Sequence, residues 1–163
     1  MKLTGALLLL LAAAGIGCRA AADLRNRVQY LRLLRQLLTA ICTELRGNLP
    51  LIPDLLHTLA ANPAYRSLHF LRCAAADAAQ FPDCWQRALA DDPAPDADTR
   101  RILETVGQTL GSTTLSGQLD TLHLCDERLQ HLLHDAEQSA AQKGQLYRSL
   151  GILSGIFLVI LII

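Results

Sequence analysis

The sequence predicts an all-α protein in which a bundle domain of about six helices is flanked by an N-terminal and a C-terminal transmembrane helix. Half of the residues are hydrophobic (51%) while only 4% are aromatic, and Leu and Ala supply most of the apolar content. Both are strong helix formers, and the β-branched residues that favour strands are sparse outside the C-terminal segment. Apolar residues also recur every three or four positions, which is the period of an amphipathic helix.

Two uncharged apolar segments, residues 3–18 and 149–163, predict the membrane anchors. Each is shorter than the roughly 20 residues that span a hydrocarbon core. The flanking Arg19 and Arg148 can make up the difference, because a long basic side chain can place its charge in the head-group layer. We therefore expect an N-terminal anchor over residues 1–22, a helical domain over 23–145 and a C-terminal anchor over 146–163.

The first apolar segment has three interpretations. It could be a signal peptide cleaved after the small residues 20–22, or a lipoprotein signal ending at Cys18, which Gly15 disfavours. It could also be an uncleaved anchor. Basic residues just past an apolar segment tend to stay in the cytoplasm, and so they favour the uncleaved anchor with a cytoplasmic domain after it. Five arginines and one acid lie close behind the segment: Arg19, Asp23, Arg25, Arg27, Arg32 and Arg35.

The first half of the domain predicts four helices. The first anchor continues as an amphipathic helix to Gly47, where glycine is a common helix stop. A second helix begins at Pro50 and ends before Asn62, and a third extends over about residues 64–79. Pro82 opens a short fourth helix. The first long helix has an apolar stripe of Leu24, Val28, Leu31, Leu34, Leu38, Ile41 and Leu45.

The second half predicts two further helices. The proline- and acid-rich stretch 91–98 is a loop, and Asp98 or Thr99 can cap the fifth helix. Residues 111–114 form a turn before a long sixth helix that continues into the C-terminal anchor. Its stripe has heptad spacing with a single polar interruption at Asp126. The stripe consists of Leu115, Leu119, Leu122, Asp126, Leu129, Leu133, Ala136 and Ala140.

Charge is unevenly distributed, although the net charge of zero gives no indication of nucleic-acid binding. Residues 19–46 hold six basic residues and two acids, whereas residues 77–98 hold six acids and one arginine. The basic stretch can contact anionic membrane lipids, and the acidic stretch is available to a protein partner. Ordinary solvation of a helix face and a loop explains both stretches equally well.

No catalytic, cofactor-binding or metal site is predicted, and we expect neither an enzyme nor a small-molecule substrate. The five cysteines form no CxxC pair, which fits small buried side chains in a reducing compartment. His131 and His134 lie on one helix face, but His123 and His134 are three turns, about 16 Å, apart along the helix, so the three cannot share one ion. A Cys/His hydrolase or a metal enzyme remains the enzymatic alternative.

Two features are candidate packing or structural sites. Gly151 and Gly155, with Ser154 between them, form a GxxxG pattern, which lets two membrane helices approach closely. Glu44 lies at the end of the apolar stripe of the first helix. It can be an exposed helix-end charge or a buried, paired one.

Three motifs resemble the stage III sporulation protein AB family of endospore-forming bacteria. They are residues 147–155 (YRSLGILSG) before an apolar end, residues 106–112 (VGQTLGS) with Gln118 beyond them, and Glu44 with Gly47, Pro50 and Leu51. Trp85, Gly107 and Gly111 are the candidate interaction or structural residues within this resemblance. The sequence departs from the family at Thr113–Thr114, where an Asp usually comes after the Ser.

The resemblance implies a domain similar to the cytoplasmic domain of the platform protein of type II secretion and type IV pilus machines. It implies a place in the mother-cell membrane around the forespore, with the central domain in the cytoplasm. Other stage III sporulation membrane proteins and a secretion-type ATPase are the implied partners. The function expected is a platform or adaptor of a secretion-like channel complex. The alternative is an exported, tail-anchored helical protein after signal removal.

Overall fold

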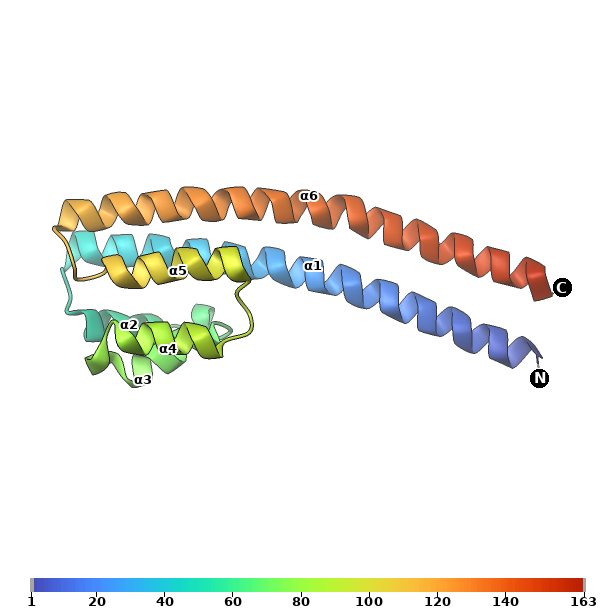
Figure 1. Cartoon of the computed structure of the whole chain (residues 1–163), viewed down its shortest axis with the longest axis horizontal. Coiled ribbons are helices and arrows are strands. Elements are labelled where there is room, and N and C mark those ends of the chain that lie inside the picture. The colour runs from blue at the N-terminus through green and yellow to red at the C-terminus, as the bar shows by residue number, and fades with distance from the viewer. Residues whose placement is uncertain (1, 163) are drawn as a thin grey trace. The chain divides into compact units, whose positions relative to one another are not determined.

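The computed structural model describes the backbone of residues 2–162 and the side chains of Arg19 and of residues 22–142, with Ala20 and Ala21 left out. Over these backbone residues the chain has six α-helices, two short 3₁₀ helices and no strand, which confirms the all-α class (Figure 1). The elements are α1 (Lys2–Gly47), α2 (Ile52–Ala61), η1 (Pro63–Tyr65), α3 (His69–Ala76), η2 (Ala78–Gln80), α4 (Asp83–Asp91), α5 (Ala97–Thr109) and α6 (Leu115–Ile162).

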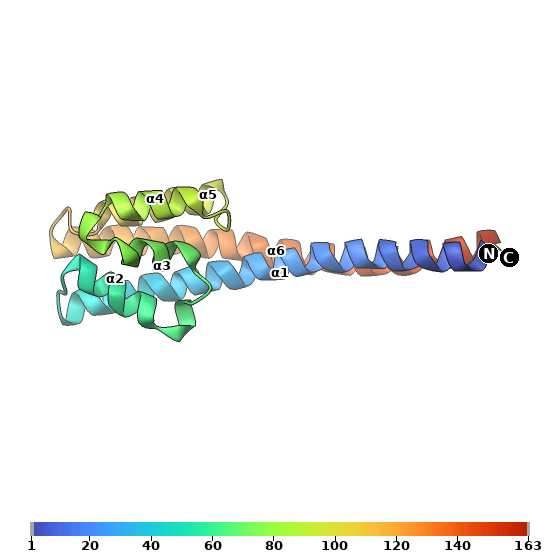
Figure 2. The same cartoon turned by 90° about the horizontal axis from the view of Figure 1, so that it is seen from below.

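The chain divides into two compact units. Unit 1 combines residues 1–30 with residues 133–163, and unit 2 consists of residues 31–132. The two helical stretches of unit 1, from α1 and α6, run antiparallel (Figures 1 and 2). The expected boundaries at residues 22 and 145 concern the membrane anchors, and they stay a prediction.

The predicted anchors fall almost wholly outside the side chains that the structure describes. Within the described residues, no helix holds a stretch that is both long and apolar enough to span a bilayer. Cys18 and the candidate packing residues Gly151, Ser154 and Gly155 also lie outside the described side chains.

Unit 2 is built around the predicted stripes of the two long helices. Leu34 and Ile41 of α1 and Leu122 and Leu129 of α6 are fully buried. The short helices complete this core: α3 packs against both α2 and α4, and α4 packs against α5 (Figure 2). The heptad spacing on α6 therefore correctly identified the side of the helix that faces the core.

The prediction of a single third helix over residues 64–79 is wrong, because this segment forms η1, α3 and η2. The Asn62 side chain accepts a hydrogen bond from the Ala64 N–H at 3.0 Å and so starts η1. The backbone of Leu68 is extended before α3 begins. The Phe70 N–H, in the first turn of α3, donates a hydrogen bond to the side chain of Asp92 at 3.0 Å. Asp92 lies in the distant loop between α4 and α5. A helix start fixed from so far along the chain leaves no local sequence signal.

Two predicted helix starts also shift. Asp96, rather than Asp98 or Thr99, caps α5, since its carboxylate accepts the Thr99 N–H at 2.9 Å. The second helix begins at Ile52 instead of Pro50. Leu51 explains this delay, because its backbone is extended, with a ψ of 142°, and so the first helical residue is Ile52.

Candidate functional site

Trp85 of α4 is the centre of the small-helix layer of unit 2. Its side chain is fully buried, and the indole N–H donates to the carbonyl of Leu103 in α5 at 2.8 Å. Phe70 meets the indole edge-on, with ring centroids 5.2 Å apart, and Phe81 does so at 6.4 Å. Such aromatic pairs add to the stability that burial alone gives. Trp85 thereby joins α3, α4 and α5 into one layer.

Gly107 makes this position of Trp85 possible. A Cβ at residue 107 would lie 2.7 Å from Nε1 and 2.9 Å from Cγ of the indole, and closer still to Cδ1. Real Cβ atoms do not approach other atoms this closely, so a larger residue would displace the ring. Trp85 and Gly107 are therefore one structural element contributed by two helices.

Gly111 and Gln118 shape the turn between α5 and α6. Gly111 has a φ of 77°, a left-handed conformation that glycine adopts at little cost. Its N–H donates to the Gln118 side-chain oxygen at 3.2 Å, and the Gln118 amide donates to the Thr113 carbonyl at 2.8 Å. The Thr114 hydroxyl accepts the Gly117 N–H at 3.4 Å, which is a long hydrogen bond at the start of α6. A hydroxyl therefore caps the helix in this segment, where the family usually has an Asp.

Asp92 connects the α4–α5 loop to the start of α3. The residue is only 2% exposed, and its carboxylate accepts the backbone N–H groups of Phe70, at 3.0 Å, and Ala94, at 2.9 Å. A negative charge at a helix N-terminus also interacts favourably with the helix dipole. Arg100 of α5 donates to the Asp92 carbonyl at 2.8 Å, which holds the loop from the other side.

Arg35 and Asp126 form a two-pronged ion pair between α1 and α6 within unit 2. The guanidinium nitrogens Nε and Nη2 donate to the two carboxylate oxygens at 2.8 and 2.9 Å. The hydrogen bond with Asp126 raises the pKa of Arg35, although desolvation opposes this effect. The polar interruption of the α6 stripe is thus a paired charge, and it favours one register of α6 against α1.

Glu44, the last candidate structural residue, is half-buried near the end of α1. Its backbone carbonyl accepts the Asn48 N–H at 3.0 Å, which closes the last turn of the helix. Whether the Glu44 carboxylate is an exposed helix-end charge or a buried, paired one stays a prediction.

The buried thiols of Cys84 and Cys125 and the half-buried thiol of Cys42 are poor candidates for a nucleophile. Burial raises the pKa of Cys42, Cys84 and Cys125 above the ordinary thiol value, which lowers the fraction of reactive thiolate at neutral pH. Cys73 differs because it is exposed on α3, with its Sγ 3.5 Å from Nδ1 of His69. This pair spans one helical turn.

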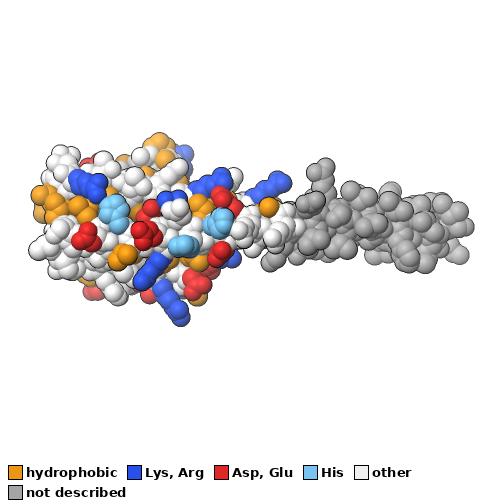
Figure 3. Space-filling view, turned by 90° about the horizontal axis from the view of Figure 1, so that it is seen from above, with side chains coloured by type: hydrophobic (Ala, Val, Ile, Leu, Met, Phe, Trp, Pro, Cys, Tyr) orange, Lys and Arg blue, Asp and Glu red, His pale blue; other side chains and the backbone are white. Residues whose placement is uncertain are grey.

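The histidines are dispersed over exposed helix surfaces. His123 accepts a hydrogen bond from Arg46 at 2.9 Å, and His134 bonds the Gln138 amide at 2.8 Å. Figure 3 shows histidines among charged side chains of both signs on the face formed largely by α6. Across the part of the chain that the structure describes, no three His, Cys, Asp or Glu side chains are grouped so that they could hold a metal ion.

Sequence reasoning missed the roles of Arg35, Asp92 and Asp96. In the sequence the Arg35 charge indicates membrane topology, and the two acids indicate an acidic loop. Heptad spacing gave a partial signal for Asp126, because a charge in an apolar stripe requires a partner. The pairing with a residue 91 positions away had no local signal.

The fold and these contacts define a small all-helical protein whose polar side chains hold helix junctions together. The model of the stage III sporulation protein AB family matches residues 2–163, and the chain belongs to this family. This confirms the resemblance and supports a role of the chain in sporulation. No curated protein and no solved structure matches the chain significantly.

Proposed function

We propose that the chain is a membrane platform or adaptor subunit of a secretion-like channel complex needed for endospore formation. In this role it links a cytoplasmic secretion-type ATPase to the membrane complex in the mother-cell membrane around the forespore. Membership of a stage III sporulation family supports the process, and the helical unit supports a scaffolding role.

The continuity of the two long helices is the observation that carries this proposal. α1 is one helix from Lys2 to Gly47, so it contains both the apolar residues 3–18 and the buried leucines of unit 2. α6 likewise contains the stripe of unit 2 and the apolar residues 149–163. Each long helix therefore joins a predicted anchor to the core of unit 2 without an interrupting loop, as an adaptor requires.

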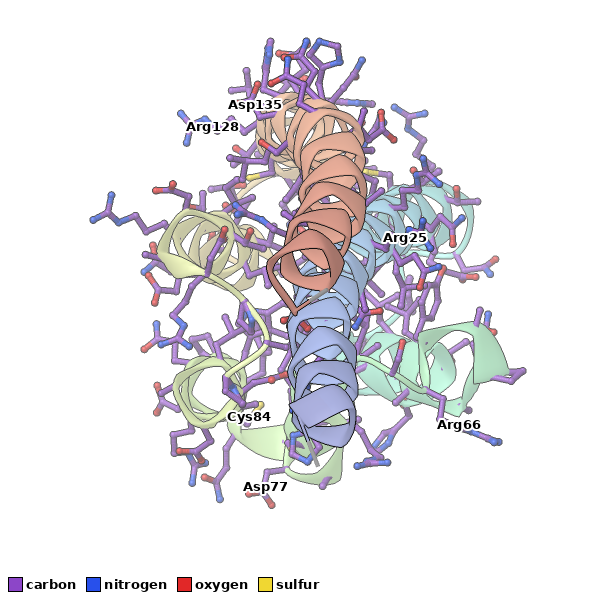
Figure 4. The ribbon with its side chains drawn as sticks, turned by 90° about the vertical axis from the view of Figure 1, so that its right-hand side faces the viewer. Arg25, Arg66, Asp77, Cys84, Arg128 and Asp135 are labelled. Atoms are coloured by element: carbon purple, nitrogen blue, oxygen red, sulfur yellow. The ribbon has the colours of Figure 1, made fainter. Side chains whose placement is uncertain are left out.

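The distribution of polar groups in unit 2 also supports scaffolding. Trp85, Asp92 and the Arg35–Asp126 pair all stabilise contacts between helices. Other acids of the 77–98 stretch are exposed at the surface: Asp77, Asp83, Asp91 and Asp98. Figure 4, which views the helices nearly end-on, shows Asp77 and Arg66 at the outer edge of the short-helix layer. These charges are available to neighbouring subunits.

Site-specific photo-crosslinking in sporulating cells tests the proposal. A photoreactive residue would replace exposed Gln86 of α4 or Gln108 of α5, and buried Leu34 would serve as the matched control position. We expect adducts with the ATPase and with other stage III membrane proteins from the exposed positions only. Stable, membrane-inserted protein that yields no such adduct would contradict an adaptor role.

Topology reporters separate the proposal from an exported, tail-anchored protein. A reporter that is active only after export would be inserted between Pro93 and Ala94, in the loop between α4 and α5. We expect it to be inactive, because the arginines after residue 18 favour a cytoplasmic location. An active reporter would support the exported alternative.

A further inference from the structure

His69 and Cys73 form an exposed pair of metal-ligating side chains one turn apart on α3. The Cys73 sulfur lies 3.5 Å from Nδ1 and 3.8 Å from Nε2 of the His69 ring. Among the described residues, the structure gives neither side chain another polar partner. The pair is therefore available to a ligand from outside the chain.

The separation of these atoms matches that of two ligands on one zinc ion. A Zn–S bond of about 2.3 Å and a Zn–N bond of about 2.0–2.1 Å, at a tetrahedral angle, place sulfur and nitrogen about 3.5–3.6 Å apart. The imidazole needs only to turn about its χ2 torsion, whose energy minima are broad, to aim a nitrogen at the ion. An S–H···N hydrogen bond has a similar separation, and a metal-binding assay distinguishes the two.

Two ligands leave the coordination of such an ion incomplete. Structural zinc sites are almost always four-coordinate, and two Cys with two His is a common ligand set. Within the described residues, no three His, Cys, Asp or Glu side chains could hold a metal ion together, so the pair has no third ligand there. A second copy of the chain can supply the two missing ligands through the same two residues. The two thiolates then balance the charge of the ion.

The charges beside the pair favour a second copy as the partner. Exposed Arg66 precedes the pair and exposed Asp77 follows it, both at the outer edge of the short-helix layer (Figure 4). A twofold axis through the ion and perpendicular to α3 sets the two α3 helices antiparallel, so that Arg66 of each copy approaches Asp77 of the other. Arg72 is also exposed, but it lies about 100° around the helix axis from Cys73, at the side of this interface.

We propose that His69 and Cys73 are one half of a zinc site, which a second copy of the chain completes with the same two side chains. The ion joins two copies through their α3 helices. This link is separate from the proposed contact with the ATPase and does not depend on it. The thiol must be reduced in order to bind zinc, which agrees with the reducing compartment that the cysteines predict.

Titration with Co²⁺ and Zn²⁺ tests the proposal on the full chain, in detergent and with its thiols reduced. Co²⁺ absorbs visible light strongly in a tetrahedral site and weakly when six water molecules surround it, and a thiolate ligand adds a sulfur-to-metal band. We expect tetrahedral absorption that saturates at one ion for each pair of chains. Sedimentation should show that Zn²⁺ converts the chain to a dimer and that a chelator reverses this change.

Replacing either ligand should remove the site. Cys73→Ser and His69→Ala should each abolish the tetrahedral absorption and the zinc-dependent dimer, while circular dichroism should show an unchanged fold because both side chains are exposed. The matched controls are Cys42→Ser on α1 and His134→Ala on α6, which remove the same kinds of ligand atom elsewhere. We expect both controls to keep the absorption and the dimer.

A charge reversal tests the second copy separately. Asp77→Arg should weaken the zinc-linked dimer, because it places like charges opposite each other at low salt, and the addition of Arg66→Asp should restore it. Neither residue ligates the ion in this proposal, so the tetrahedral absorption at high protein concentration should survive in the double variant.

Four results would overturn the proposal. Six-coordinate absorption of Co²⁺ in the wild-type chain would leave the pair as an ordinary hydrogen bond. Tetrahedral absorption that survives Cys73→Ser would place the ion elsewhere. One ion bound to each monomer would show that water, and not a second copy, completes the site. A dimer that forms equally well in a chelator would remove zinc from the link.

Discussion

Replacing Gly107 by Ala tests the packing of Trp85 against α5. In an exposed helix interior this change stabilises a protein by about 0.5–1 kcal/mol, because alanine loses less backbone entropy on folding. At residue 107 the added Cβ would lie 2.7 Å from Nε1 and 2.9 Å from Cγ of the indole. The indole cannot withdraw freely, because its N–H is bonded to the Leu103 carbonyl at 2.8 Å. Overpacking of this kind costs about 1–3 kcal/mol, so we expect net destabilisation.

Denaturant unfolding of the full chain in detergent, monitored by circular dichroism, measures this effect. Gly47→Ala is the matched control, because a Cβ there meets nothing within 4 Å, and we expect it to be neutral or stabilising. In a Trp85→Phe background the cost of Gly107→Ala should shrink, since the smaller ring leaves space for the methyl group. Equal stability of the two alanine variants would refute the reasoning, as would a cost that is independent of residue 85.

Three further predictions concern the polar contacts of unit 2. Asp92→Ala should lower the free energy of unfolding by about 2–4 kcal/mol in the same assay, because it leaves two backbone N–H groups without their acceptor; a loss below about 0.5 kcal/mol would contradict this. Arg35→Ala and Asp126→Ala should each cost only about 1 kcal/mol, since the side chains are 32% and 28% exposed, and a double-mutant cycle should show favourable coupling between them. Alkylation of the native chain should modify Cys73 well before Cys84, because burial and a raised pKa both slow the reaction of the Cys84 thiol. Raising the pH should accelerate the alkylation of both cysteines, because it increases the fraction of thiolate. Equal alkylation rates for Cys73 and Cys84 would contradict the difference in their burial.

The parts of the fold that could be predicted from the sequence are those with a repeated local signal. The α1 and α6 stripes have helical spacing over many turns, and Gly111 lies in the expected turn because only glycine adopts its backbone conformation cheaply. The broken third helix could not be predicted, because Asp92 fixes the start of α3 from 22 residues away. Local propensity does not report such tertiary contacts.

The candidate site was predictable to a similar extent. Trp85 and Gly107 were identified as individual residues within the family resemblance, but no sequence pattern indicates that they contact each other. The contact depends on how α4 packs against α5, and that geometry is set by the whole layer. The sequence shows Asp126 as an interruption of the stripe, but it does not distinguish a pairing role of Arg35 from a topology signal, because one positive charge can serve either purpose.

Membrane flotation of the secretion-type ATPase from sporulating cells tests the adaptor function most directly. In cells with the wild-type chain, the account predicts that the ATPase floats with the membranes. In a deletion strain it should stay in the soluble fraction, and sporulation should stop after engulfment. Variants with Ala at Cys73 or at His69 should restore flotation, because scaffolding needs no nucleophile. An ATPase that floats equally well in the deletion strain would contradict the account.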